Sequence, residues 1–109
     1  MNSFIAVAWN NGQHNASGDG YGLKISASDR DTYFRREWRV VTLRLKGREH
    51  LAIVNIEKES FWNDTCRELI SKQIGGWLIE NGCAPWPPRN PPNVRIKSIA
   101  EGEFECEVI

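Results

Sequence analysis

Residues that favour β-strands gather in six short stretches of the chain, bounded by residues that favour turns. Where apolar and polar positions alternate, as from Thr42 to Lys46, the pattern is that of a strand with one buried face and one wet face. The expected strands cover residues 4–9, 21–26, 40–46, 51–56, 94–99 and 103–108. We expect 40–56 to form a hairpin turned at Gly47-Arg48-Glu49, and 94–108 to form another turned at Ala100-Glu101-Gly102.

Two further stretches carry helix signals. Ser28 is expected to cap a short helix from Asp29 to about Arg36, with early acids and late arginines complementing the helix dipole. A longer helix is expected before the C-terminal hairpin, because one face repeats there at spacings of three and four. This face comprises Trp62, Cys66, Leu69, Ile70, Gln73, Ile74, Trp77 and Leu78. Gly75-Gly76 is expected to kink this helix or divide it into helices at about 61–73 and 76–81, since two glycines cost about 2 kcal/mol relative to alanines.

The order of these elements indicates an α+β, mainly β fold in a single domain spanning residues 1–109. The chain has 109 residues, of which 40% are hydrophobic and 26% charged, and this is the size and composition of one globular domain. Strands at both ends and in the middle, with one short helix and one longer helix before the last hairpin, predict a small, partly open barrel. Five prolines between residues 85 and 92 predict an extended connection without helix.

Charge is balanced over the whole chain but segregated along it. Lys plus Arg and Asp plus Glu number 14 each, so the chain is not a strongly basic nucleic-acid-binding protein. Residues 24–48 nevertheless hold eight basic and three acidic side chains, a local net charge of +5. Near the C-terminus, carboxylates recur at every second position and so share one strand face. They belong to Glu101, Glu103, Glu105 and Glu107.

The strongest candidate binding site is a set of six cationic residues, here called the basic block. It comprises Arg35, Arg36, Arg39, Arg44, Lys46 and Arg48. Arg44, Lys46 and Arg48 fall at alternate positions and so share one strand face. Arg35, Arg36 and Arg39 come from the end of the preceding helix and the segment that leads into the strand. The six side chains can therefore converge on phosphates. Alternatively, the block is a solvated face that keeps the protein soluble. Trp86, held among prolines, is a further candidate for stacking on a base or a partner side chain; otherwise it covers one end of the barrel.

No catalytic, metal or cofactor signature is present in the sequence, and we expect no enzyme. Cys66, Cys83 and Cys106 form no C-x-x-C pair, and we expect reduced thiols with Cys66 on the apolar helix face and Cys106 in the core. His14 and His50 fall in expected surface loops, far from any pattern that pairs them with a nucleophile. The glycine-rich stretch 10–22 lacks the spacing of a phosphate cradle and is expected to be an exposed, mobile loop. No apolar run is long enough to span a membrane, which favours a cytoplasmic location.

Part of this order resembles a known family. The resemblance rests on a strand that enters Leu23-Lys24-Ile25-Ser26-Ala27-Ser28-Asp29, on the hairpin 40–56, and on Gly76-Trp77-Leu78-Ile79-Glu80-Asn81-Gly82 before a closing hairpin. This order of elements is similar to that of the B-three-type DNA-binding pseudobarrel. That domain occurs in plant transcription factors and as the recognition domain of some restriction endonucleases. The resemblance covers most of residues 20–109 and implies DNA binding by two loop arms that enter the major groove. The neutral charge, the long expected helix and the proline-rich stretch depart from the family, so no base-reading residue is transferred. The whole chain also resembles small bacterial proteins.

Two functions are therefore expected as alternatives. The first is a small soluble binding domain that contacts DNA or another nucleic acid through the basic block and Trp86. The second is a protein-binding module without catalytic activity, such as an inhibitor, an immunity factor, an antitoxin or a homodimer. Segregated charge serves this second function equally well, because it steers a partner of complementary charge.

Overall fold

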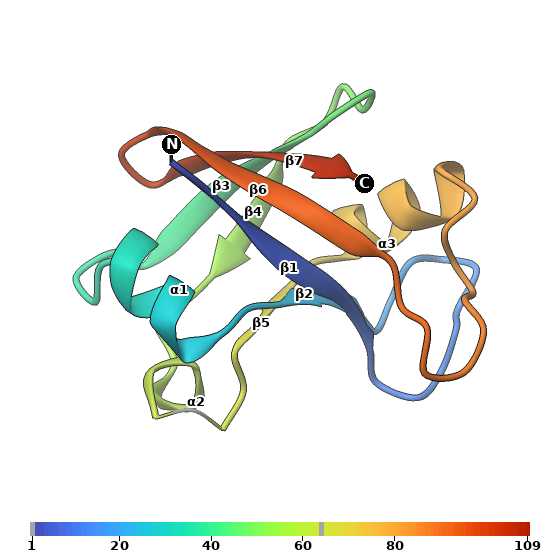
Figure 1. The fold of residues 1–109 in the computed structure, drawn as a ribbon, viewed down its shortest axis with the longest axis horizontal. Helices are drawn as coiled ribbons and strands as arrows, with labels where there is room; N and C mark the ends of the chain where they lie inside the picture. The colour runs from blue at the N-terminus through green and yellow to red at the C-terminus, as the bar shows by residue number, and fades with distance from the viewer. Residues whose placement is uncertain (1, 64) are drawn as a thin grey trace.

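The fold is a seven-stranded sheet that curls into a nearly closed barrel with three short helices (Figure 1). The computed structural model describes residues 2–63 and 65–109. The strands are β1 (Ser3–Asn10), β2 (Tyr21–Lys24), β3 (Val40–Leu45), β4 (Ala52–Asn55), β5 (Glu68–Ile70), β6 (Asn93–Ala100) and β7 (Glu103–Val108). The helices are α1 (Ala27–Tyr33), α2 (Glu59–Trp62) and α3 (Lys72–Glu80). The mainly β, barrel-like class expected from the sequence is confirmed.

The strand order is β4-β3-β7-β6-β1-β2-β5, which leaves β4 and β5 at the two ends of the sheet. Both expected hairpins are present, β3 with β4 and β6 with β7. These hairpins join through a parallel pairing of β3 with β7, from Thr42 opposite Glu103 to Leu45 opposite Cys106. All other strand pairs are antiparallel. The parallel pair therefore connects the middle of the chain to its C-terminal end.

Alternating side chains of the strands fill one core inside the barrel. Leu43 and Leu45 of β3 and Phe104 of β7 are at most 1% exposed. The Phe104 ring stacks on that of Phe34, with 4.9 Å between centroids, and lies edge-on to Phe4 of β1. The core thus joins the C-terminal hairpin to β1 and to the segment that follows α1.

Helix α1 begins and ends earlier than the sequence predicted. Ser26, and not Ser28, is the N-cap: its Oγ accepts a hydrogen bond from the backbone N–H of Asp29 at 3.0 Å and donates to the Asp29 carboxylate at 3.0 Å. This reciprocal pair fixes the start of the helix. At the other end Phe34 adopts extended backbone and enters the core, so Arg35 and Arg36 lie beyond the helix.

The long helix predicted before the C-terminal hairpin is wrong. Residues 59–62 form the single turn of α2, residues 68–70 form β5, and only α3 continues as a helix. The helix-like spacing of Cys66 and Leu69 has a different cause, because Leu69 points into the barrel from β5 and lies opposite Leu23 of β2. Pairing with β2 provides hydrogen-bond partners for the backbone N–H and C=O groups of this segment, and this pairing outweighs the local preference for helix.

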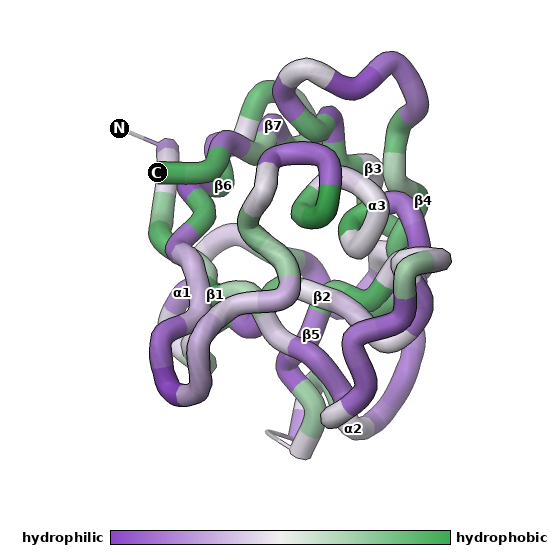
Figure 2. The backbone as a smooth tube through the Cα atoms, turned by 90° about the vertical axis from the view of Figure 1, so that its right-hand side faces the viewer, coloured by the Kyte–Doolittle hydropathy of each residue, from purple (hydrophilic) through white to green (hydrophobic). Residues whose placement is uncertain are grey.

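Gly75 and Gly76 lie inside α3 and do not interrupt it. A Cβ at Gly75 would overlap the carbonyl oxygen of Gly18, so this glycine lets the connection between β1 and β2 pack directly on the helix. Gly18 itself is buried, and the expected exposed loop is therefore anchored at this point. α3, this connection and the proline-rich connection gather at one end of the barrel, which Figure 2 views directly.

Candidate functional site

Two members of the basic block, Arg44 on the outer face of β3 and Lys46 just after its end, lie beside the carboxylates of β7. Arg44 is opposite Glu105 in the parallel register. One step along, the Lys46 Nζ donates a hydrogen bond to Glu107 Oε2 at 2.5 Å. This hydrogen bond and the charge of Glu107 raise the pKa of Lys46, and the same contact lowers the pKa of Glu107. Lys46 is thus ion-paired with the acidic face, whereas Arg44 lies opposite Glu105 in the strand register without an ion pair in the described part of the chain.

Strand β6 supplies a second row of cations on the other side of β7. Arg95 lies opposite Glu107 and Lys97 opposite Glu105. Arg95 Nη1 is 3.5 Å from Glu107 Oε1. Each of these carboxylates therefore lies between two cationic residues on neighbouring strands. We call this arrangement the charge ladder; it comprises Arg44, Lys46, Glu105, Glu107, Arg95 and Lys97.

The other members of the basic block are directed to separate neighbours. Arg35 pairs with Glu101 at 3.8 Å, and Arg39 pairs with Glu57 at 3.4 Å. The Arg36 guanidinium lies 5.3 Å from the centre of the Trp62 ring, at cation–π distance. The structure brings Arg44 and Lys46 together and places these three arginines beside the β6–β7 turn, the segment after β4, and α2.

Arg48 has a packing position against α3. A Cβ at Gly76 would lie 2.6 Å from Arg48 Nη1, so the guanidinium group rests on the helix where a glycine leaves room. The same Nη1 is 3.2 Å from Glu80 Oε1 at the end of the helix. Close by, the Trp77 indole donates to the Lys46 carbonyl at 2.9 Å. Arg48 and Trp77 therefore fasten the β3–β4 turn to α3.

Trp86 packs over one end of the barrel. Its ring is edge-on to His14 and Tyr21, with centroid distances of 5.1 and 5.8 Å. His14 Nδ1 is 2.8 Å from the Tyr21 hydroxyl, whose side chain is buried. The position agrees with the covering role considered for this residue.

A feature that the sequence reasoning missed is an apolar patch on the outer face of β3 and β4. It comprises Val40, Leu51 and Ile53, which are 48%, 46% and 58% exposed. Ile53 lies opposite Thr42, and Val40 opposite Asn55, so Val40 and Ile53 share one face. Leu51 comes just before β4, two positions from Ile53, and continues that face by the alternation of strand side chains. The sequence does hold a signal for it. From Leu51 to Val54 every residue is apolar, and only Ala52 and Val54 of these four are needed inside the barrel.

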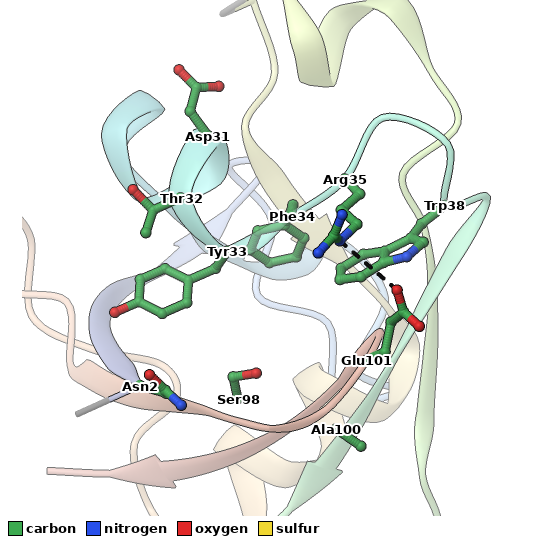
Figure 3. Close-up of a pocket in the computed structure, with 10 residues that line it drawn as sticks. All are labelled: Asn2, Asp31, Thr32, Tyr33, Phe34, Arg35, Trp38, Ser98, Ala100 and Glu101. Carbon is green, nitrogen blue, oxygen red and sulfur yellow. Dashed lines mark ion pairs between the residues drawn. The ribbon is translucent and has the colours of Figure 1, made fainter.

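A hollow of about 650 Å³ lies between the end of α1 and the β6–β7 turn (Figure 3). Each of its charged lining groups, on Asp31, Arg35 and Glu101, is already in an ion pair. Arg35 points toward Glu101, and Asp31 is 3.0 Å from Arg30. No two of its lining carboxyl groups face each other in Figure 3, so the hollow offers no paired acid and base.

Metal-binding and membrane-spanning features are not found in residues 2–63 and 65–109. This part of the chain holds no cluster of three or more side chains suited to a metal ion. It also holds no helix with the length and apolar character needed to cross a membrane. All three cysteines are free. Cys106 is in the core as expected, and burial raises the pKa of its thiol to about 12. Cys66 lies between α2 and β5 and not on a helix face, which corrects the sequence-based placement.

Comparison with known proteins yields no relative: no family model, no curated protein and no solved structure matches this chain.

Proposed function

We propose that the protein is a non-catalytic binding module that contacts a partner protein through the apolar patch. The observation that carries this proposal is the exposure of three branched apolar side chains on one strand pair. Exposed apolar side chains that are single need no explanation, whereas a group of them rimmed by polar residues is the usual anatomy of a protein interface. Here the rim is the charge ladder on one side and the Arg39–Glu57 ion pair on the other.

The charge of the rim indicates what the partner presents. Arg44 continues the outer face of β3 from Val40 and Thr42, and it forms no ion pair with any described residue. A partner with an apolar centre and a carboxylate aligned with Arg44 would match both features. Such a carboxylate raises the rate of encounter and fixes orientation more than it adds affinity.

The test is affinity capture from a lysate of the source organism, with two matched charge substitutions. Ile53→Glu places a carboxylate in the apolar patch. Val7→Glu makes a similar change at another exposed β-branched side chain, 38% exposed on β1 and opposite Lys24 and Asn93, outside the charge ladder. We expect a protein retained by the wild type and by Val7→Glu to be lost with Ile53→Glu. The proposal fails if every retained protein responds equally to both substitutions and the wild type is monomeric in sedimentation.

Nucleic-acid binding stays a second candidate on one observation. The charge ladder holds two more cations than carboxylates, and neither Arg36 nor Arg44 forms an ion pair with the described residues. If this function is right, affinity for duplex DNA falls with salt by about one unit of log–log slope for each phosphate contact, and Arg44→Gln lowers that slope by about one. If wild-type protein does not bind duplex DNA at low salt, only the protein partner remains.

A further inference from the structure

Outside the proposed interface, Cys66 lies in a cluster of charged side chains drawn from three elements. Its Sγ–H donates to Glu68 Oε1 on β5 at 2.9 Å. The Lys58 Nζ, just before α2, is 3.6 Å from the same sulfur. Lys24 Nζ on β2 approaches the other oxygen of Glu68 at 3.9 Å. Glu68 is 6% exposed, while Cys66 is partly accessible to solvent.

This arrangement holds the two groups that activate a thiol. A carboxylate in hydrogen-bond contact with Sγ can accept the thiol proton, and a neighbouring ammonium group stabilises the thiolate that results. Lys58 is the ammonium group in contact with the sulfur, and Lys24 offsets part of the negative charge of Glu68. Access from solvent then allows a small oxidant to reach the sulfur.

The two other cysteines lack these neighbours. Cys83 is also partly exposed, but its Sγ–H donates a hydrogen bond to the carbonyl oxygen of Asn81, at 3.6 Å, and has no charged partner among the described residues. Cys106 is fully buried between β-sheet neighbours. The chain therefore contains an accessible thiol with an activating cluster, an accessible thiol without one, and an inaccessible thiol.

We propose that Cys66 is a peroxide-sensitive modification site, with Glu68 as its proton acceptor and Lys58 as the group that stabilises its thiolate. Glu68 takes the Sγ proton, and the thiolate attacks one oxygen of hydrogen peroxide. An S–O bond forms as the O–O bond breaks, and the departing hydroxide takes the proton back from Glu68 to become water. The thiol and one peroxide thus give one sulfenic acid and one water, with sulfur oxidised by two electrons and the peroxide reduced by two.

The experiment compares the three cysteines within one molecule. The full chain is exposed to limiting hydrogen peroxide in the presence of a dimedone-type probe, and labelling of each cysteine is followed by peptide mass spectrometry. We expect Cys66 to be labelled about tenfold or more faster than Cys83, and Cys106 to remain unlabelled. Labelling of Cys66 at the same rate as Cys83 overturns the proposal.

Two variants separate the activating groups from a merely structural effect. Lys58→Met and Glu68→Gln should each bring the rate at Cys66 down toward that at Cys83, while the rate at Cys83 itself does not change. Labelling of Cys106 reports whether a variant has unfolded, and the Lys58→Met variant decides the matter if Glu68→Gln unfolds. An unchanged Cys66 rate in folded Lys58→Met contradicts the assignment of Lys58.

Discussion

At Gly75 the absence of a side chain makes room for another part of the chain. The carbonyl oxygen of Gly18 occupies the position that a Cβ would need, in a contact between residues far apart in sequence. The neighbouring Gly76 faces a different atom type, because the nearest atoms to its missing Cβ belong to the Arg48 guanidinium. One glycine therefore meets rigid backbone and the other meets the end of a flexible side chain.

This difference predicts unequal effects for the same substitution at the two positions. Gly75→Ala should lower the free energy of unfolding by about 1–3 kcal/mol, because the overlap with Gly18 exceeds the gain in helix propensity of about 1 kcal/mol. Gly76→Ala should stay within about 1 kcal/mol of the wild type, since Arg48 can move aside and alanine favours the helix. Equilibrium urea unfolding measures both, and equal losses would contradict this account.

The local sequence alone does not predict how Gly75 and Gly76 are accommodated. A glycine pair in an apolar, helix-spaced stretch predicts a break when only propensity is considered. The contact that keeps the pair inside α3 involves Gly18 and Arg48, and no local pattern reveals it. In the same way, the short spacing from Cys66 to Glu68 is visible in the sequence, but the approach of Lys24 requires β2 and β5 to pair.

At the scale of elements, the charge ladder depends on the register of three strands. The pKa of Glu107 is held below its ordinary value first by the hydrogen bond from Lys46, then by the charge of Lys46, with a smaller contribution from Arg95. Because folding lowers this pKa, the contact stabilises the fold at pH values above the unfolded pKa. That contribution is lost as the pH falls through the folded pKa.

Lys46→Met should therefore raise the pKa of Glu107. It should also reduce the amount by which the free energy of unfolding falls as the pH is lowered through that pKa. Lys97→Met is the matched control, since Lys97 lies opposite Glu105 and not Glu107. Carboxyl carbon chemical shifts followed through a pH titration report the pKa of Glu107 in each protein. If both substitutions move that pKa equally, the specific Lys46 contact is not its cause.

The elements differ in how far their sequences reveal them. Both hairpins are predictable, because alternation and a glycine turn lie within a few residues of each other. β5 is not, because its three residues belong to an apolar pattern of helical spacing and acquire strand structure only beside β2. The basic and acidic strand faces are each readable, but their pairing depends on the parallel contact of β3 with β7, which no short pattern encodes.

For the whole molecule, Phe104 is a point where distant parts of the chain meet. It lies on β7, stacks on Phe34 after α1 and approaches Phe4 of β1, and it is 1% exposed. Its removal affects the parallel strand pair and the core at the same time. The barrel is closed by such long-range contacts more than by local structure.

Phe104→Ala should cost about 3–5 kcal/mol of unfolding free energy, a large part of the roughly 5–15 kcal/mol of a typical domain. Ile99→Ala, at a position 42% exposed on β6, should change it by no more than about 0.5 kcal/mol. Thermal and urea unfolding followed by circular dichroism provide the measurement. A small loss for Phe104→Ala would show that the three rings do not support the barrel as described.

The row formed by Lys46, Glu107 and Arg95 also limits how the chain can evolve. Lys46 and Glu107 are 61 positions apart, yet inverting the sign of the carboxylate alone would set three positive groups in a line. The repulsion is avoided only when all three residues change sign together. A related chain that carries a cation at position 107 should therefore carry acidic residues at positions 46 and 95.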